Sequence, residues 1–179
     1  MNIIYKIARK IKHYRNPVGY WRSMGVQIGD KAEIYRSVSF GSEPYLITLG
    51  NHVRVNEHVT FVTHDGGVWV LRGLPSAFYL NPQIREIDLF GRITVGDNVH
   101  IGNNAIIMPG VTIGSNCVIG CGAIVTRDIP DNSIAVGIPA RVIENIDVYF
   151  KKHEKEFDYT KGMNQKKKQE YLLKKYNPD

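Results

Sequence analysis

Residues 93–129 read ITVGDNVHIGNNAIIMPGVTIGSNCVIGCGAIVTRDI, and this stretch decides the fold. An aliphatic residue recurs at every sixth position, and a small or aliphatic residue follows each of them after four positions. The first set comprises Val95, Ile101, Ile107, Ile113, Ile119 and Val125, and the second comprises Val99, Ala105, Val111, Cys117, Ala123 and Ile129. An α-helix of about 3.6 residues per turn cannot keep a six-residue repeat on one face, whereas short strands joined by turns can. The repeat therefore predicts short strands with two inward side chains in every six residues.

The same register continues upstream in a second block of repeats. Its inward positions are Ile28, Ile34, Phe40, Leu49, Val55 and Phe61, with Ala32, Val38, Val53 and Val59 at the second inward position. Three repeats per coil would give a triangular solenoid of parallel strands, with successive coils about 4.8 Å apart. Residues such as Gly96, Gly102, Asn98 and Asn104 are expected at its corners, because left-handed backbone angles cost other residue types more. The predicted fold class is an all-β solenoid.

Two breaks in the register interrupt the solenoid. The first contains Ser42-Glu43-Pro44-Tyr45, and the second spans residues 65–92 without any repeat. The aromatic residues of the second break are Trp69, Phe78, Tyr79 and Phe90. A long excursion from a regular repeat is usually either functional or flexible. The apolar content of this one predicts a packed loop that serves as a lid or a partner-binding arm.

The basic charge of the chain is concentrated at its ends. Residues 1–25 hold six basic residues and no acidic one, whereas residues 26–143, the expected solenoid domain, hold eight basic and ten acidic residues. Apolar residues near the N-terminus fall on one face of an amphipathic helix that Asn16-Pro17 would end. This helix either caps the open end of the solenoid or makes a peripheral membrane contact with anionic lipid through residues 1–15. Residues 144–179 are expected to form a charged helical extension.

Composition argues against several classes of protein. The chain has 179 residues, of which 43% are hydrophobic and 22% charged, which is typical of a folded domain. It has no apolar run of about 18 residues and no secretory signal pattern, so neither a transmembrane helix nor secretion is expected. Two cysteines, Cys117 and Cys121, are too few for a disulfide framework, which favours a cytoplasmic protein. The near balance of charge in residues 26–143 argues against a nucleic-acid partner.

The repeats resemble those of the hexapeptide-repeat acyltransferases, which fold as left-handed parallel β-helices. The resemblance covers residues 26–143, and its most specific part ends in VTRDIPDNSIAVGIPARVI at residues 125–143. The segments SEPYLITLG at residues 42–50 and VTFVTHDGGVWVLR at residues 59–72 look closest to polysaccharide-modifying O-acetyltransferases. The resemblance implies a homotrimer that binds acetyl-CoA in clefts between its subunits.

His64 is the last residue before the second break, and Asp65-Gly66-Gly67 follows it. The resemblance implies that His64 is the general base, a task that suits imidazole because its neutral form accepts a proton. The alternative is a corner histidine that bonds to local backbone. Glu43 either orients this imidazole, binds a sugar hydroxyl or is a solvated acid in a turn. Asp65 and Trp69 are candidate acceptor-binding residues.

The resemblance also implies which residues contact coenzyme A. Its pantetheine arm would pass the small residues of one coil edge, namely Gly102, Asn103, Cys121 and Gly122. Three further residues at the end of the repeats complete this candidate site, namely Thr126, Arg127 and Arg141. The two arginines suit the nucleotide phosphates, with ordinary surface charge as the alternative. His100 stands where sugar acetyltransferase relatives often have a tryptophan beside the thioester arm.

Two other chemistries are weighed against direct transfer. His52, His58 and His64 are six residues apart, so they would point about 120° apart on a triangular coil, which argues against a metal site. A covalent route would need a cysteine nucleophile. Cys117 occupies an inward repeat position, and Cys121 has no neighbouring base in the sequence. Direct attack without a covalent enzyme intermediate is therefore expected.

These observations predict an acetyl-CoA-dependent O-acetyltransferase that acts on a saccharide hydroxyl, such as that of a surface-polysaccharide unit. The nearest alternative is N-acetylation of an amino sugar. A non-catalytic solenoid scaffold is a second alternative, and it predicts no affinity for coenzyme A. A zinc hydratase is a third, and it predicts bound metal.

Overall fold

A computed structural model describes residue 11, residues 13–75 and residues 82–177 of the chain. Its contacts divide the chain into two compact units, Met1–Asp147 and Val148–Asp179. Within the described residues, no helix has the length and apolar character needed to cross a membrane.

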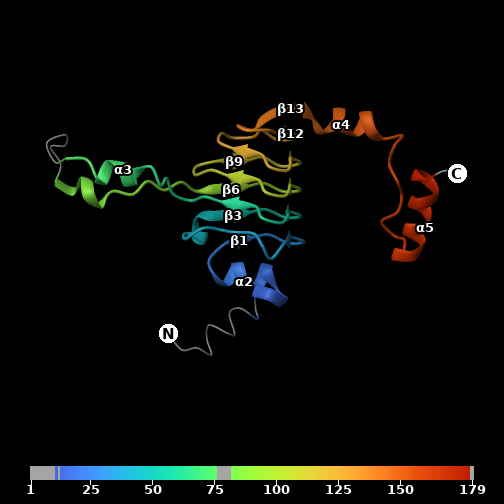
Figure 1. The fold of residues 1–179 in the computed structure, drawn as a ribbon, viewed down its shortest axis with the longest axis horizontal. Coiled ribbons are helices and arrows are strands. Elements are labelled where there is room, and N and C mark those ends of the chain that lie inside the picture. Colours follow the sequence, from blue (N-terminus) through green and yellow to red (C-terminus); the bar gives the residue numbers. More distant parts are fainter. Residues whose placement is uncertain (1–10, 12, 76–81, 178–179) are drawn as a thin grey trace. The chain divides into compact units, whose positions relative to one another are not determined.

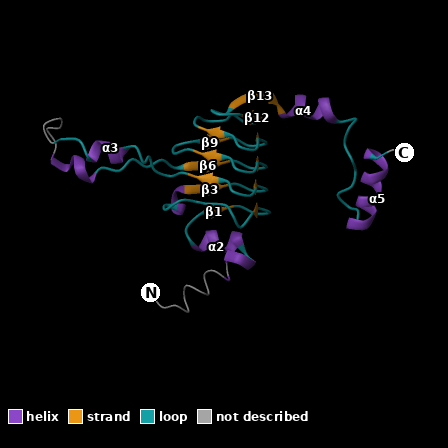
Figure 2. Ribbon diagram, viewed as in Figure 1, coloured by secondary structure: helices purple, strands orange, loops and turns teal. Residues whose placement is uncertain are grey.

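Three sheets build the first unit, and the chain visits them in turn (Figures 1 and 2). In spatial order, sheet A contains β1 (Gln27–Ile28), β3 (Ile47–Leu49), β6 (Ile93–Val95) and β9 (Thr112–Ile113). Sheet B contains β13 (Arg141–Asn145), β12 (Ser133–Val136), β10 (Val118–Ile119), β7 (His100–Ile101), β4 (Arg54–Val55) and β2 (Glu33–Ile34). Sheet C contains β11 (Ile124–Val125), β8 (Ile106–Ile107) and β5 (Thr60–Phe61). Only β13 runs antiparallel to its neighbour among these strands, so the predicted stack of parallel strands is confirmed.

The repeat positions form the core between the three sheets. Every inward position from Ile34 to Ile129 is buried, whereas Ile28 and Ala32 in the first coil are only half-buried. In the described part of the chain the first coil is covered not by another coil but by the short helix α2 (Pro17–Ser23), whose Val18 and Trp21 pack against the core. Trp21 of α2 packs against Phe40 with a ring-centroid distance of 4.8 Å. The core is therefore a single column of apolar side chains that α2 closes at one end.

The corners follow the prediction for asparagine but not for glycine. Asn98 and Asn104 have φ angles of 56° and 61°, in the left-handed region. Gly96 and Gly102 do not, so the expectation that left-handed angles require them was wrong. A Cβ on Gly102 would lie 2.7 Å from the backbone nitrogen of Cys121 in the next coil. Glycine is needed there because successive coils approach too closely for a side chain.

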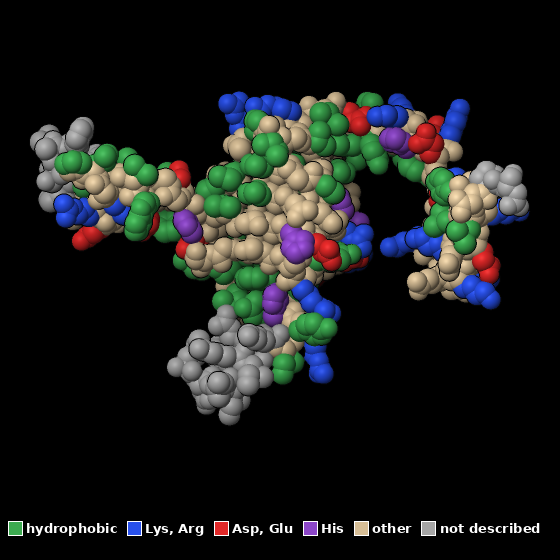
Figure 3. Space-filling model, viewed as in Figure 1, with side chains coloured by type: hydrophobic (Ala, Val, Ile, Leu, Met, Phe, Trp, Pro, Cys, Tyr) green, Lys and Arg blue, Asp and Glu red, His purple; other side chains and the backbone are tan. Residues whose placement is uncertain are grey.

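The long excursion forms an arm that projects from the solenoid in Figure 1. It contains α3 (Val68–Arg72) and η3 (Pro82–Glu86), and its two ends are joined by backbone hydrogen bonds at residues 63–65 and 89–91. Hydrophobic side chains gather along the arm (Figure 3), and 76% of the Trp69 surface is exposed. Trp69 is therefore not packed within this chain, and the prediction of a lid or a partner-binding arm stays a prediction. Phe78 and Tyr79 lie outside the described residues.

The N-terminal segment turns where the sequence predicts. Residues 13–15 are helical, and Asn16 then caps α2 by accepting a hydrogen bond from the Gly19 nitrogen at 2.8 Å. The Arg22 side chain of α2 donates to the carbonyl oxygens of Ile28 and Gly29, which fastens the helix to the first coil. Most of the amphipathic helix expected before Asn16 lies outside the described residues.

The second unit contains helices within the expected extension of residues 144–179, but Glu144 and Asn145, at the start of that extension, belong to strand β13. It contains most of α4 (Ile146–His153) and all of α5 (Gln165–Tyr176). Asp158 accepts hydrogen bonds from Tyr171 and Lys175 of α5, at 2.5 and 2.6 Å. This carboxylate therefore ties the segment between the helices to α5.

Candidate active site

His64 lies where the arm leaves sheet C. The strand β5 ends two residues before Thr63, and Gly91 returns from the arm to donate a hydrogen bond to the Thr63 carbonyl at 2.9 Å. The imidazole of His64 meets the Phe90 ring edge-on, at a centroid distance of 6.2 Å. Its side chain is 44% exposed. The point where the arm joins sheet C thus holds this imidazole with one side open to solvent.

Glu43 contacts the imidazole from the first break in the repeats. This break folds into the short helix η1 (Pro44–Leu46), and Glu43 immediately precedes it. The Glu43 Oε2 atom lies 3.0 Å from Nδ1 of His64 and accepts a hydrogen bond from Oγ1 of the buried Thr63 at 2.6 Å. The hydrogen bonds from Thr63 and His64 hold the pKa of the Glu43 carboxyl below its ordinary value. Glu43 is therefore an ionised carboxylate near pH 7.

The charge of Glu43 determines which nitrogen of His64 carries the proton. A carboxylate only accepts hydrogen bonds, so Nδ1 of His64 must be the protonated nitrogen in this pair. In the neutral ring, Nε2 then has a free lone pair that can take a proton from a substrate. The partner of Nδ1 is a carboxylate and not the backbone oxygen that a corner histidine would use. This arrangement has the geometry of a general base held by a carboxylate.

The two candidate acceptor residues on the arm do not join this pair. The Asp65 carboxylate accepts a hydrogen bond from the Gly67 nitrogen at 2.7 Å, which forms a local turn. Trp69 lies on α3 and is largely exposed. Across the described ranges, no hydrogen bond or ion pair connects either residue to Glu43.

The four small residues assigned to the pantetheine arm lie together on another edge of the solenoid. We call this the B–C edge, because its residues follow the strands of sheet B and precede those of sheet C. Gly122 donates a backbone hydrogen bond to Asn103 at 2.8 Å, and Gly102 lies directly against Cys121 in the next coil. A Cβ on Gly122 would meet no atom within 4 Å, so open space borders its backbone. A thin chain can lie along this edge.

The remaining candidates for coenzyme A occupy three different places. Thr126 and Arg127 are exposed just after β11, and Arg141 begins β13 at the end of sheet B. His100 is half-buried in β7, where it pairs in register with Arg54 of β4. Burial, and secondarily the positive charge of Arg54, lower the pKa of His100. His100 is therefore neutral near pH 7.

Thr63 is a site residue that sequence reasoning missed. It is fully buried and polar, and its hydroxyl satisfies the same carboxylate oxygen that His64 contacts. The sequence offers one indication of this role: Thr63 immediately precedes the candidate base and lies two residues after the inward repeat position Phe61. That signal is weak, because threonine is common in strands for its shape alone.

The other histidines and the buried cysteine have separate surroundings. Nδ1 of His52 lies 2.8 Å from Oδ1 of Asn98. Both residues follow strands of sheet A and precede strands of sheet B, whereas His64 follows a strand of sheet C. In the parts of the chain that the structure covers, no group of three or more His, Cys, Asp or Glu could hold a metal ion. Burial raises the pKa of the Cys117 thiol, which makes it a poor nucleophile.

The repeats of this chain have counterparts in known proteins. Residues 92–127 match the family model described as bacterial transferase hexapeptide (six repeats). Protein CapG of Staphylococcus aureus is 49% identical over 158 residues, which cover 87% of this chain and 86% of that protein. The galactoside O-acetyltransferase of Escherichia coli (strain K12) is 39% identical over 119 residues, which cover 64% of this chain and 54% of that enzyme. The chain thus spans most of CapG but only about half of the E. coli enzyme.

A solved structure extends the similarity to the fold. The structure of a galactoside acetyltransferase in complex with coenzyme A matches with a TM-score of 0.54 and 29% sequence identity. The match covers 87% of this chain and 85% of that chain.

Proposed function

The chain belongs to the hexapeptide-repeat acyltransferases and is an acetyltransferase, and from this premise we propose its reaction. It transfers the acetyl group of acetyl-CoA to a hydroxyl of a saccharide, such as a surface-polysaccharide unit. The single observation that carries this proposal is the contact between Glu43 and Nδ1 of His64, which leaves Nε2 free to act as a base. We further propose a left-handed winding of the coils and a cytoplasmic location, the latter because both cysteines are unpaired.

The proposed mechanism is a direct transfer. Acetyl-CoA, when bound, supplies an activated acyl carbon and a thiolate leaving group whose conjugate thiol has a pKa of about 8.5. Nε2 of His64 takes the proton of the sugar hydroxyl as its oxygen forms the new ester bond. Glu43 holds the ring in place and stabilises the positive charge that His64 then carries. The same imidazolium returns the proton to the departing sulfur, which restores the neutral base.

A complete site requires a second copy of the chain. His64 lies at the edge between sheets C and A, whereas the small residues around Cys121 line the B–C edge. Outward-facing Ile106 and Ile124 of sheet C are half-buried within one chain, and they offer an apolar face for a neighbouring subunit. We propose a homotrimer in which one subunit supplies the base and its neighbour supplies the coenzyme A edge.

The reaction is tested by measuring acetyl-CoA binding and acetyl transfer separately. Calorimetry should show saturable acetyl-CoA binding to the wild-type chain. Transfer to a panel of hydroxyl and amino acceptors should favour hydroxyl acceptors. His64→Ala should reduce kcat by about 10²- to 10⁴-fold while acetyl-CoA binding persists. A folded chain that binds no acetyl-CoA would instead be a scaffold, and a preference for amines would assign N-acetylation.

The division of the site between subunits is tested by complementation. Cys121 is exposed, so Cys121→Trp should block the B–C edge without disturbing the core. Chains with His64→Ala and chains with Cys121→Trp should each be inactive alone. Each proposed site needs an intact His64 from one subunit and an intact B–C edge from its neighbour. When the two variants are co-assembled at equal amounts, about one quarter of the interfaces combine both, so about one quarter of the sites should recover activity. No recovery in verified mixed oligomers would show that each site lies within one chain.

A further inference from the structure

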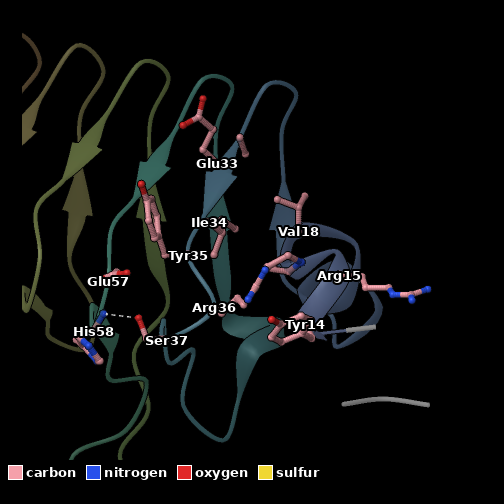
Figure 4. Close-up of a pocket in the computed structure, with 12 residues that line it drawn as sticks. Tyr14, Arg15, Val18, Glu33, Ile34, Tyr35, Arg36, Ser37, Glu57 and His58 are labelled. Carbon is pink, nitrogen blue, oxygen red and sulfur yellow. Dashed lines mark hydrogen bonds between the residues drawn. The ribbon is translucent and has the colours of Figure 1, made fainter. Parts of the chain in front are cut away.

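A groove of about 620 Å³ lies between the N-terminal helices and the first two coils (Figure 4). Tyr14 lines it from the helical side, and Tyr35 and Arg36 line it from the first coil. Glu57 and His58 line it from the second coil. All five of these side chains are exposed to solvent. The groove therefore combines aromatic faces, a guanidinium and a carboxylate in a space large enough for a sugar.

The groove lies on the same edge of the solenoid as the proposed pantetheine residues. Along the B–C edge, Asn104 donates a backbone hydrogen bond to Glu57 at 3.0 Å, and Gly122 donates one to Asn103 at 2.8 Å. The groove thus continues the line of this edge toward the N-terminal end of the solenoid. Glu57 and His58 of the groove belong to the second coil, as does His64. The groove and the proposed base therefore lie at the same level along the solenoid axis.

Arg36 is positioned in this groove by the ring of Tyr14. Its Cζ atom lies 3.7 Å from the centroid of the Tyr14 ring, which is cation–π geometry. In the described residues, no acidic side chain pairs with it, whereas Arg54 pairs with Glu33 at 2.7 Å. A guanidinium stacked on a ring keeps its N–H donors at the edge, where they suit a phosphate or a carboxylate.

The two sides of the groove differ in chemistry. Figure 4 shows Arg36 beside Tyr14 on one side, and Glu57 with His58 on the other. Ser37 accepts a hydrogen bond at its hydroxyl from the His58 backbone nitrogen at 3.0 Å, which fixes that corner without using the imidazole. One side thus suits an anion, and the opposite side suits sugar hydroxyls, which donate hydrogen bonds to a carboxylate.

We propose that this groove binds an anionic saccharide acceptor, with Arg36 contacting its phosphate ester or carboxylate and Glu57 contacting its hydroxyls. The inference rests on the proposed function, since it names the class of acceptor for the same site. A phosphate ester would identify a nucleotide-linked or lipid-linked sugar, and a carboxylate would identify a uronic acid. Both groups present two oxygen atoms that can accept a pair of hydrogen bonds from a guanidinium.

The experiment is equilibrium binding to the full chain, with and without coenzyme A, using three matched probes. These are glucose 1-phosphate, glucuronic acid and the neutral methyl glucoside. At least one anionic probe should bind about 10- to 100-fold more tightly than the neutral probe, because a hydrogen bond to a charged group contributes that much. Arg36→Gln should abolish this preference. Lys31→Gln removes the same charge from a different edge of the first coil and should preserve it.

Each outcome decides the inference. Preference for glucose 1-phosphate alone assigns a phosphate ester, and preference for glucuronic acid alone assigns a uronic acid. Equal affinity for the neutral probe, no binding of either anion up to about 10 mM, or a preference that survives Arg36→Gln would overturn it. Acetyl-CoA binding is measured on the same preparation. Binding of acetyl-CoA without any anion preference overturns only this inference, whereas its absence overturns the proposed function.

Discussion

Glu43→Gln should slow acetyl transfer while it leaves the fold and the affinity for acetyl-CoA unchanged. Glutamine has nearly the same shape as glutamate, and its oxygen can still accept the hydrogen bond from Thr63. It carries no negative charge, however, so it cannot stabilise the imidazolium that His64 becomes when it takes the hydroxyl proton. The variant therefore removes the charge and keeps the packing.

The size of the effect follows from the contact between Glu43 and His64. Their atoms Oε2 and Nδ1 are 3.0 Å apart, which is a good hydrogen-bond distance. A hydrogen bond to a charged group contributes about 1.5–3 kcal/mol. The His64 side chain is 44% exposed, so solvent screening reduces this to about 1–2 kcal/mol. The expected loss in kcat is about 5- to 30-fold.

The assay is release of the coenzyme A thiol at saturating acetyl-CoA and acceptor. Glu154→Gln is the matched control, because Glu154 is an exposed acid of the second unit and loses the same charge. The control should retain wild-type kcat. If Glu43→Gln keeps kcat within about twofold of wild type, or instead weakens acetyl-CoA binding, the role of Glu43 as a positioning residue is refuted.

The same carboxyl makes stability depend on pH in a defined direction. The pKa of Glu43 is lowered in the folded chain, so its contribution to stability is present above the ordinary value of 4.5 and is lost as the pH falls through the lowered pKa. The difference in unfolding free energy between wild type and Glu43→Gln should therefore be largest near neutral pH and shrink in acid. Denaturant titrations at several pH values measure it, and a difference that grows in acid would contradict the assignment.

Three further outcomes test the fold and its electrostatics. Arg54→Gln should raise the midpoint of the His100 titration observed by NMR, because the nearby positive charge is one of the two causes that lower the pKa of His100. An unchanged midpoint would leave burial as the sole cause. Gly102→Ala should cost about 2–4 kcal/mol in denaturant unfolding because its Cβ meets backbone, whereas Gly66→Ala, with open space around it, should change stability by less than about 0.5 kcal/mol. Phe61→Ala should cost about 3–5 kcal/mol by the same measurement, since Phe61 is fully buried and stacks on Phe40, and a cost below about 1 kcal/mol would contradict that packing.

Much of the fold follows from local pattern, and the limits of that pattern are specific. The six-residue period predicts which side chains enter the core because a strand points alternate residues inward and a corner resets the direction. The same reasoning gave the wrong cause for Gly102. Its backbone angle is ordinary, and its lack of a side chain matters only because Cys121 of the next coil lies against it. A contact between coils is not visible in the repeat itself.

The candidate site shows the same division. His64 is identifiable in the sequence because it ends the second block of repeats and matches a family position. The role of Glu43 is not, because Glu43 is 21 residues away and the sequence allows a solvated turn as readily as a contact. The helix η1 and the buried hydroxyl of Thr63 together bring its carboxylate to the imidazole. Only the tertiary structure shows that Thr63 joins Glu43 and His64 in one cluster.

By itself, the sequence determines the stack of parallel strands and its inward residues, because both depend on a six-residue period, and its resemblance to a family points to His64 as the proposed base. The tertiary structure decides which groups surround that base and where the arm and the groove lie. The Cζ atom of Arg36 lies 3.7 Å from the centroid of the Tyr14 ring because α2 folds the N-terminal segment back over the first coil. Contacts of this kind depend on how an irregular segment packs against a regular one, and burial and hydrogen bonding across the whole unit set that packing.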